Sequence, residues 1–258
     1  MANPRAVRER THRTVKPARQ QDDGMTPELD TIGVLGGMAS ASTVEYYRLI
    51  DQSINDELGG HNDGEVLIRS VNFGEIERFI RDQQWETAGE RLAAAAQELE
   101  AGGADFIVMA TNTMHKVAPA IADAVTIPFV HLVDVTADAI TDAGLETVGL
   151  LGTQPTMEQP FYRDRLAEHG INVVVPDRAD RETVDRIIFE ELTHGETSER
   201  SRRTYLRVVD DLVEDGADGL VLGCTEIKLL IDQDDRPALP MFDTTALHVE
   251  RAVERSLG

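Results

Sequence analysis

The sequence is short of cysteine, of lysine and of long apolar runs, and each shortage excludes a class of protein. Cys224 is the single cysteine among 258 residues, which excludes an intramolecular disulfide and any metal site built from several cysteines. No apolar run approaches the roughly 20 residues that a membrane-spanning helix needs, and no secretory leader precedes the first expected strand. We therefore expect a cytoplasmic protein with no membrane partner.

Positive charge is scarce as well. The chain carries 25 Lys and Arg against 47 Asp and Glu, a formal net charge of −22, and only three of its basic residues are lysine. This excess of negative charge argues against a surface that binds a phosphate backbone or anionic lipids, so we expect neither nucleic acid nor an anionic membrane as a partner. The acidic residues are spread through the chain, as in a salt-adapted, halophilic cytoplasmic protein; an ordinary acidic protein is the alternative.

The chain divides into a tail and a folded part. Residues 1–28 carry six Lys and Arg and almost no apolar periodicity, so we expect a disordered tail. The alternatives are a basic interaction arm and a misassigned start codon, since Met25 lies just before the first expected strand. From Thr31 onward, short β-rich apolar runs alternate with helical periodicity, which predicts an α/β protein with parallel strands. The expected strands are Thr31–Leu35, Glu65–Val71, Phe106–Ala110, Phe129–Leu132, Thr147–Leu151, Ile171–Val175 and Gly219–Leu222. The expected helices include Ala41–Leu58, Trp85–Ala101, Pro160–Glu168, Asp180–Leu192 and Glu199–Glu214.

Two pairs of segments repeat along the chain. Ile32–Gly37 reads like Val148–Thr153, and Ile107–Thr113 reads like Leu220–Glu226, at offsets of 116 and 113 residues. The nearly equal offsets predict two pseudo-symmetric lobes, each a mostly parallel sheet flanked by helices. In each lobe a buried strand ends in a small or polar turn, which is where open α/β sheets bind ligands.

The repeat also predicts how the lobes are divided. We assign residues 29–130 and 238–258 to the first lobe and residues 131–237 to the second, with the active site in the cleft between them. Superimposing the second pair of segments sets Thr111 opposite Cys224. If a pseudo-twofold axis relates the lobes, these two side chains face each other across the cleft.

The repeated segments at residues 107–113 and 220–226 contain side chains that can transfer protons or bind a carboxylate. Gly223 lets a ligand approach the backbone, and the turn after Cys224 exposes N–H groups that would lower the thiol pKa from about 8.5 toward neutrality. Thr225 and these N–H groups can hold a carboxylate. Asn112 and Thr113 offer further donors in the opposite segment. The alternatives are a cysteine that only packs and a threonine that only caps a helix.

These segments also carry a family resemblance. Gly33–Met38, Thr111–His115, Gly149–Thr153 and Gly223–Glu226 resemble the motifs of the aspartate/glutamate racemase superfamily, and the match runs from about residue 31 to residue 253. Within it, the chain most resembles the L-aspartate/glutamate-specific racemases, on the segments Tyr46–Ile50, Thr156–Gln159, Ile187–Glu191 and Phe242–Thr244.

The resemblance implies a cofactor-independent amino-acid racemase, an isomerase with no metal, that acts as a homodimer on a small amino-acid substrate, aspartate or glutamate. By resemblance, Cys224 removes the α-proton of the L enantiomer and Thr111 donates a proton to the opposite face. Because threonine is a poor base, turnover of the D enantiomer should be slow. His115 or Glu226 would assist Thr111. The residues expected to contact the substrate are Met38, Asn112, Thr113, Thr153 and Thr225.

The chain departs from the family pattern at the position expected to bind the substrate side chain. Relatives that act on aspartate or glutamate place a lysine where Thr183 stands, so the expected cation is missing. The candidates to replace it are Arg78, Arg81, Arg181 and Arg186, and the alternative for each is a solvated surface charge. Two other functions stay open: a one-cysteine decarboxylase of malonate-type acids, and a catalytically idle amino-acid-binding protein.

Overall fold

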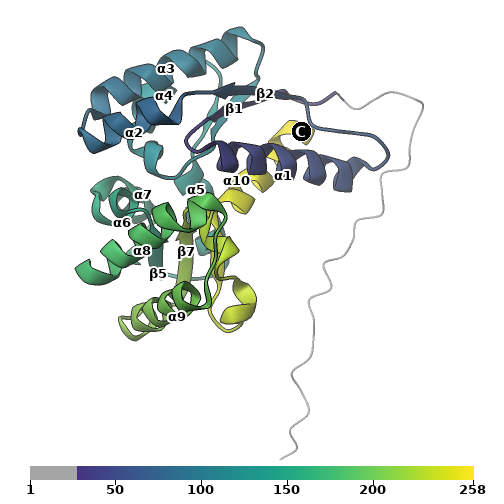
Figure 1. Ribbon diagram of the computed structural model, residues 1–258. Helices are drawn as coiled ribbons and strands as arrows, with labels where there is room; N and C mark the ends of the chain where they lie inside the picture. The colour runs from purple at the N-terminus through teal and green to yellow at the C-terminus, as the bar shows by residue number, and fades with distance from the viewer. Residues whose placement is uncertain (1–27) are drawn as a thin grey trace, which may run out of the picture.

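The computed structural model describes residues 28–258, which form two four-stranded parallel sheets, one in each lobe (Figure 1). The predicted tail therefore lies outside the described residues except for its last position. The first sheet has the order β2-β1-β3-β4, with β1 (Ile32–Gly36), β2 (Val66–Ser70), β3 (Phe106–Met109) and β4 (Phe129–Val130). The second has the order β6-β5-β7-β8, with β5 (Thr147–Gly152), β6 (Asn172–Val174), β7 (Gly219–Gly223) and β8 (Met241–Asp243).

The two strand orders are the same, because β1 corresponds to β5 and β3 to β7. The predicted α/β fold with two pseudo-symmetric lobes is confirmed, and the repeated segments fall on these two pairs of strands. The central strands are continuous apolar runs that are buried on both faces. Close packing also explains Gly223, since a Cβ there would lie 2.9 Å from the carbonyl oxygen of Leu151 on β5.

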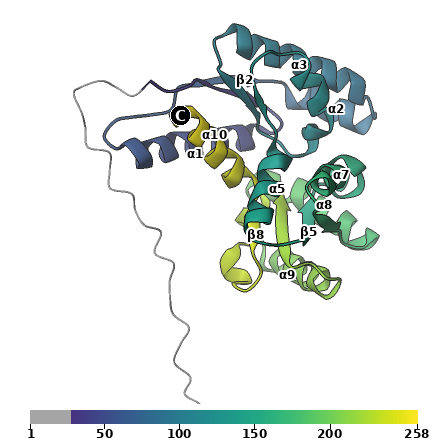
Figure 2. The same cartoon turned by 180° about the vertical axis from the view of Figure 1, so that it is seen from behind.

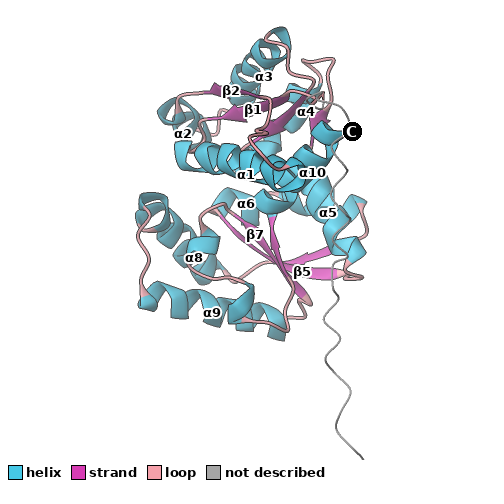
Figure 3. Ribbon diagram, turned by 90° about the vertical axis from the view of Figure 1, so that its right-hand side faces the viewer, coloured by secondary structure: helices cyan, strands magenta, loops and turns pink. Residues whose placement is uncertain are grey.

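Helices cover both faces of each sheet (Figure 3). On the first sheet, α1 (Ser40–Leu58) and α10 (Thr244–Leu257) pack on one face, and α2 (Phe73–Arg81), α3 (Trp85–Ala101) and α4 (Ala118–Ala122) pack on the other. On the second sheet, α5 (Leu132–Asp142) and α7 (Pro160–Glu168) oppose α6 (Gln154–Glu158), α8 (Arg178–Glu190) and α9 (Glu199–Glu214). Short 3-10 helices span Thr113–Val117 (η1), Leu192–His194 (η2), Ile227–Leu229 (η3) and Gln233–Asp235 (η4).

The structure corrects one lobe boundary. Residues 238–258 were expected in the first lobe, but β8 lies in the second sheet because it pairs in parallel with β7. The helix that follows, α10, packs on the first sheet beside α1 and also touches α5, so it joins the two lobes (Figure 2).

The strand expected to reach Leu132 ends at Val130. The next residue, His131, caps α5, where its side chain accepts a hydrogen bond from the backbone N–H of Val133. Between residues 28 and 258, no helix combines the length and the hydropathy needed to cross a bilayer.

An ion pair also links the lobes. Lys228 on η3 places its Nζ 2.8 Å from Oε1 of Glu45 on α1 and 3.5 Å from Oδ2 of Asp243. Hydrogen bonds from Arg48 and Lys228 lower the pKa of Glu45 to about 2. The carboxylate therefore stays ionised and keeps α1 tied to the second lobe at neutral pH.

Candidate active site

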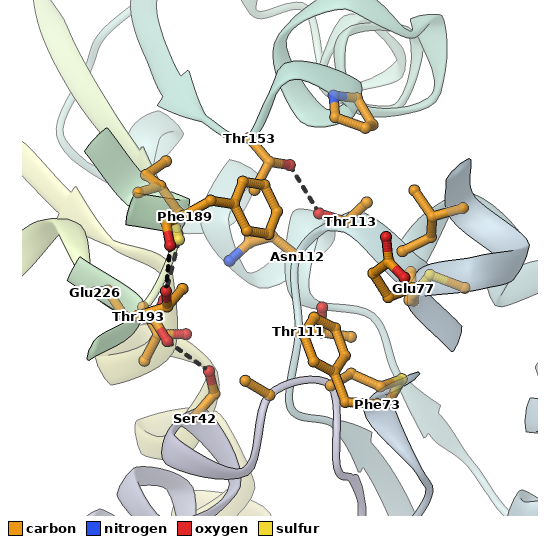
Figure 4. A pocket seen from close by; sticks show the side chains of 18 of the residues that line it. Ser42, Phe73, Glu77, Thr111, Asn112, Thr113, Thr153, Phe189, Thr193 and Glu226 are labelled. Atoms are coloured by element: carbon orange, nitrogen blue, oxygen red, sulfur yellow. Dashed lines mark hydrogen bonds between the residues drawn. The ribbon is translucent and has the colours of Figure 1, made fainter. Parts of the chain in front are cut away.

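A cavity of about 370 Å³ lies between the lobes at the carboxyl ends of the strands (Figure 4). This edge of a parallel sheet is where α/β proteins bind ligands. The cavity is lined by every residue that the sequence predicts to be catalytic or to contact substrate, namely Met38, Thr111, Asn112, Thr113, Thr153, Cys224 and Thr225. Of the two predicted assisting residues, Glu226 lines it and His115 does not.

Cys224 stands directly after β7 and is paired with a carboxylate. Its thiol donates a hydrogen bond to Oε2 of Glu226 at 3.0 Å, and the hydroxyl of Ser42 donates to the other oxygen, Oε1, at 3.2 Å. Figure 4 shows Ser42 beside Glu226 and Thr111 at a distance from both. Glu226 is thus held from both lobes, with one oxygen on the sulfur.

The pKa expected for Cys224 is wrong in direction. Burial raises the pKa of the thiol well above its usual range, and the charge of Glu226 raises it further. The expected lowering needed a helix N-terminus at the turn. The helix there, η3, has only three residues and so offers a weak dipole, while the nearest charge is negative. In the free protein the thiol therefore holds its proton.

Thr111 stands after β3, in the place that corresponds to Cys224. Within residues 28–258 its hydroxyl makes no hydrogen bond to the protein. Its carbonyl oxygen accepts a hydrogen bond from Nδ1 of His115 at 2.7 Å, and Nε2 of the same ring accepts from the N–H of Leu132 at 3.2 Å. Both ring nitrogens of His115 are therefore occupied, so the ring fixes the backbone at Thr111 and has no nitrogen free for the cavity.

Burial also keeps this histidine neutral. It lowers the pKa of His115 well below its usual range and those of the neighbouring His131 and His248 to about 4. The ring centroid of His115 lies 4.7 Å from that of His131 and 6.0 Å from that of His248. Three uncharged rings thus pack together behind Thr111.

Polar contacts join the lobes at the back of the cavity. The hydroxyl of Thr113 lies 2.9 Å from that of Thr153 and 3.2 Å from that of Thr156, and the last two are 3.1 Å apart. Asn112 donates from Nδ2 to the hydroxyl of Thr244 at 3.1 Å and accepts from the hydroxyl of Tyr162 at 3.3 Å. These bonds fix the orientation of the donors that would face a substrate carboxylate.

The charges on the cavity wall are mostly negative. Glu77, Asp185 and Glu226 line it, and within the described chain Arg81 is the single Lys or Arg that does. Arg81 is exposed and pairs with Glu77 at 3.1 Å. Asp185 is half-buried on α8, and its Oδ1 accepts a hydrogen bond from the N–H of Gln154 at 2.6 Å.

The other expected cations point elsewhere. Arg78 lies over the ring of Phe79 at 5.6 Å, while Arg181 pairs with Glu158 and Arg186 with Glu190. Thr183 donates to the carbonyl oxygen of Ala179 at 2.8 Å and lines a different cavity together with Arg186. Thr183 therefore does not line the cavity between the lobes. The face of α8 that lines this cavity carries Asp185.

Sequence analysis missed one wall of the cavity. It consists of residues from α1, α2 and α8 that follow helical spacing: Ser42, Phe73, Ile76, Glu77, Ile80, Asp185, Ile188 and Phe189. The spacing of three and four residues within α2 and within α8 could have shown that each set shares one face. It could not have shown that these faces meet in the cleft.

A model of the Asp/Glu/Hydantoin racemase family matches residues 35–252. The chain belongs to this family. It is an amino-acid racemase, and therefore an isomerase, with the two-lobe fold of the Asp/Glu racemases.

Three similar proteins illustrate the range of the family. A solved structure of a candidate Asp/Glu racemase from Yersinia pestis is 46% identical, with a TM-score of 0.84, and the match covers 89% of this chain and all (100%) of that one. An aspartate racemase homologue from Pyrococcus horikoshii is 34% identical, with a TM-score of 0.79 and coverage of 88% and 99%. The broad specificity amino-acid racemase RacX of Bacillus subtilis is 24% identical over 242 residues, which are 88% of this chain and 98% of RacX.

Proposed function

We propose that this racemase works without a cofactor, with Cys224 and Thr111 on opposite faces of the substrate α-carbon. The observation that supports this proposal most strongly is their placement. They follow β7 and β3, which are corresponding strands of the two lobes, and both line the same cavity.

In the proposed reaction, Glu226 acts as the base that deprotonates the thiol of Cys224. Its Oε2 accepts the thiol proton of Cys224, along the hydrogen bond that joins them, and the thiolate then removes the α-proton of the L enantiomer. The substrate ammonium favours this transfer, because a nearby positive charge lowers the pKa of a thiol. Substrate binding and activation of the base are thus coupled.

The proton then returns on the other face. The hydroxyl of Thr111 donates its proton to the α-carbanion, which gives the D enantiomer. After the product leaves, Glu226 releases its proton to solvent and the threonine oxygen takes one up through water, so that both groups return to their starting states. Thr113, Thr225 and Asn112 line the cavity as donors for the substrate carboxylate, where they stabilise the charge of the carbanion. Exchange that starts from the D enantiomer is slow, because a threonine hydroxyl releases its proton far less readily than a thiol.

The test is loss of the α-proton signal in deuterated high-salt buffer, followed by proton NMR. Aspartate and glutamate, which the resemblance implies as substrates, are included with a panel of neutral and basic amino acids. Wild type should exchange at least one L-amino acid, and Cys224→Ala should reduce the rate at least about a thousandfold. Exchange that survives in Cys224→Ala, or no exchange with any amino acid, would contradict the proposal. The homodimer, the salt adaptation and the cytoplasmic location stay predictions.

A further inference from the structure

The carboxylate of Asp185 has an unusual environment for a group on the wall of a substrate cavity. It is half-buried and, within residues 28–258, it pairs with no Lys, Arg or His side chain. The hydrogen bond that it accepts from the N–H of Gln154 uses Oδ1. Burial raises the pKa of Asp185, and the nearby charge of Glu158 adds to this rise. A carboxylate in this state is stabilised by any cation that enters the cavity.

The rest of the wall does not favour an acidic side chain. A distal carboxylate would meet the charges of Glu77, Asp185 and Glu226, and Arg81 is already paired with Glu77 at the exposed rim. Like charges brought together in a partly desolvated cleft repel one another. The charge of the cavity therefore selects against aspartate and glutamate.

We propose that this cavity takes an amino acid with a cationic side chain, an amine or a guanidinium, and that Asp185 is its counter-ion. The inference rests on the proposed function, since it names the substrate class of the same site. Ile188 and Phe189 stand three and four residues after Asp185 on α8 and line the same cavity. They offer an apolar surface for the methylene stem of lysine or arginine, whose charged end then reaches the carboxylate.

Asp185 could instead hold the α-ammonium, which every amino acid carries. The two roles have different consequences. A partner of the α-ammonium affects all substrates alike, whereas a partner of the side chain affects only cationic ones. Norleucine separates these roles, because it has the apolar stem of lysine without the terminal amine.

The experiment measures α-proton exchange of L-lysine, L-norleucine, L-aspartate and L-glutamate with the full chain, in one buffer of fixed salt. Lysine should exceed norleucine in kcat/KM by roughly tenfold, which is the contribution of one charge-assisted pair in a partly buried site. In Asp185→Asn this ratio should fall to about one through a higher KM for lysine, while norleucine changes little. The amide keeps an acceptor for the N–H of Gln154, so the fold of the turn is preserved.

The matched control is Glu190→Gln on the same helix. Glu190 pairs with Arg186 outside the cavity, and its substitution should leave the ratio of lysine to norleucine unchanged. Equal exchange of lysine and norleucine by wild type, faster exchange of aspartate or glutamate than of lysine, or an equal loss for lysine and norleucine in Asp185→Asn would each overturn the inference and leave the proposed racemisation standing. No exchange with any of the four, nor with other amino acids, would overturn the proposed function and the inference with it.

Discussion

The segments that follow β3 and β7 occupy corresponding places in the two lobes, and they differ in chemistry. After β7, Cys224 donates to a carboxylate that is itself held by Ser42. After β3, the hydroxyl of Thr111 has no hydrogen-bond partner in the described chain, and only its backbone is fixed by His115. The shared topology places both side chains on one cavity. In the proposed mechanism, the partners of each group decide which of the two can act as a base.

The residues behind Cys224 and behind Thr111 also differ in charge. Behind Cys224 lie charged groups, with Glu226 on the sulfur and the ion pair of Lys228 and Glu45 one turn further along the chain. Behind Thr111 lie neutral histidine rings. In the proposed mechanism, Cys224 therefore exchanges a proton with its own partner, whereas Thr111 depends on solvent.

Among changes to the surroundings of Cys224 and Thr111, the largest effect is expected from removing the partner of the sulfur. Glu226→Gln should lower the exchange rate of the L enantiomer about a hundredfold, because the thiol loses the base that accepts its proton. The thiol should also titrate at lower pH than in wild type, since the charge of Glu226 raises its pKa. Exchange kinetics and the ultraviolet absorbance of the thiolate check the two effects. An unchanged rate, or a thiol pKa that rises, would show that Glu226 does not act on Cys224.

The second change places a cysteine at both of the corresponding positions, 111 and 224. Thr111→Cys should raise exchange of the D enantiomer about tenfold, because a thiol becomes a base far more readily than a hydroxyl. The measurement compares initial exchange rates of D and L enantiomers in deuterated buffer. Thr113→Cys, which puts a thiol in the same cavity at a place that does not correspond to Cys224, should not produce this gain. An equal gain from both variants would contradict the importance of the paired positions.

A third change acts on the neutral rings behind Thr111. The pKa of His131 falls from 6.5 to about 4 on folding. Between these two pH values the histidine is therefore protonated in the unfolded chain and neutral in the folded chain. Stability should be lost over this interval. His131→Asn keeps an acceptor for the N–H of Val133 and removes the titration, so the loss between pH 7 and pH 5 should shrink by about 1 kcal/mol. Chemical denaturation at both pH values measures it, and an unchanged pH dependence would contradict the account.

The smallest effect is expected from the ion pair behind Cys224. Lys228→Met should lower the free energy of unfolding by about 1 kcal/mol or less, because both side chains are partly exposed. Glu45 has a pKa of about 2 in the folded chain, so its contribution to stability is present above the ordinary pKa of 4.5 and is lost as pH falls toward 2. In Lys228→Met the pKa of Glu45 in the folded chain should lie closer to 4.5, so the stability lost in acid should be smaller and should be complete at a higher pH. Acid titration of unfolding checks this, with Glu45→Gln expected to abolish the difference.

The sequence was informative where its signal was repetitive. The two pairs of repeated segments predicted two similar lobes, with Thr111 and Cys224 at corresponding positions. Both residues line one cavity, because corresponding strands of the two sheets end at the same edge. The three-residue strand β8 was missed because so short a run carries no periodicity, and its neighbour in space, β7, is distant in sequence.

The substrate end of the cavity shows where sequence reasoning stops. Thr183 and Asp185 are two residues apart, which on a helix turns the side chains about 200° away from each other. Alignment pointed to Thr183, whereas the face that lines the cavity carries Asp185. Likewise, the thiol pKa depends on Glu226 and on burial, and the motif alone does not specify the rotamer that joins them.

The protonated state of Cys224 also bears on how long the protein survives oxidants. Peroxides attack the thiolate and largely spare the thiol. A thiol that keeps its proton and donates a hydrogen bond to Glu226 in the free protein is therefore a poor target. In the proposed mechanism it becomes reactive only when a substrate lies over it and excludes other molecules. With one cysteine in the chain and no second thiol to repair it, this timing preserves the sulfur on which every turnover would depend.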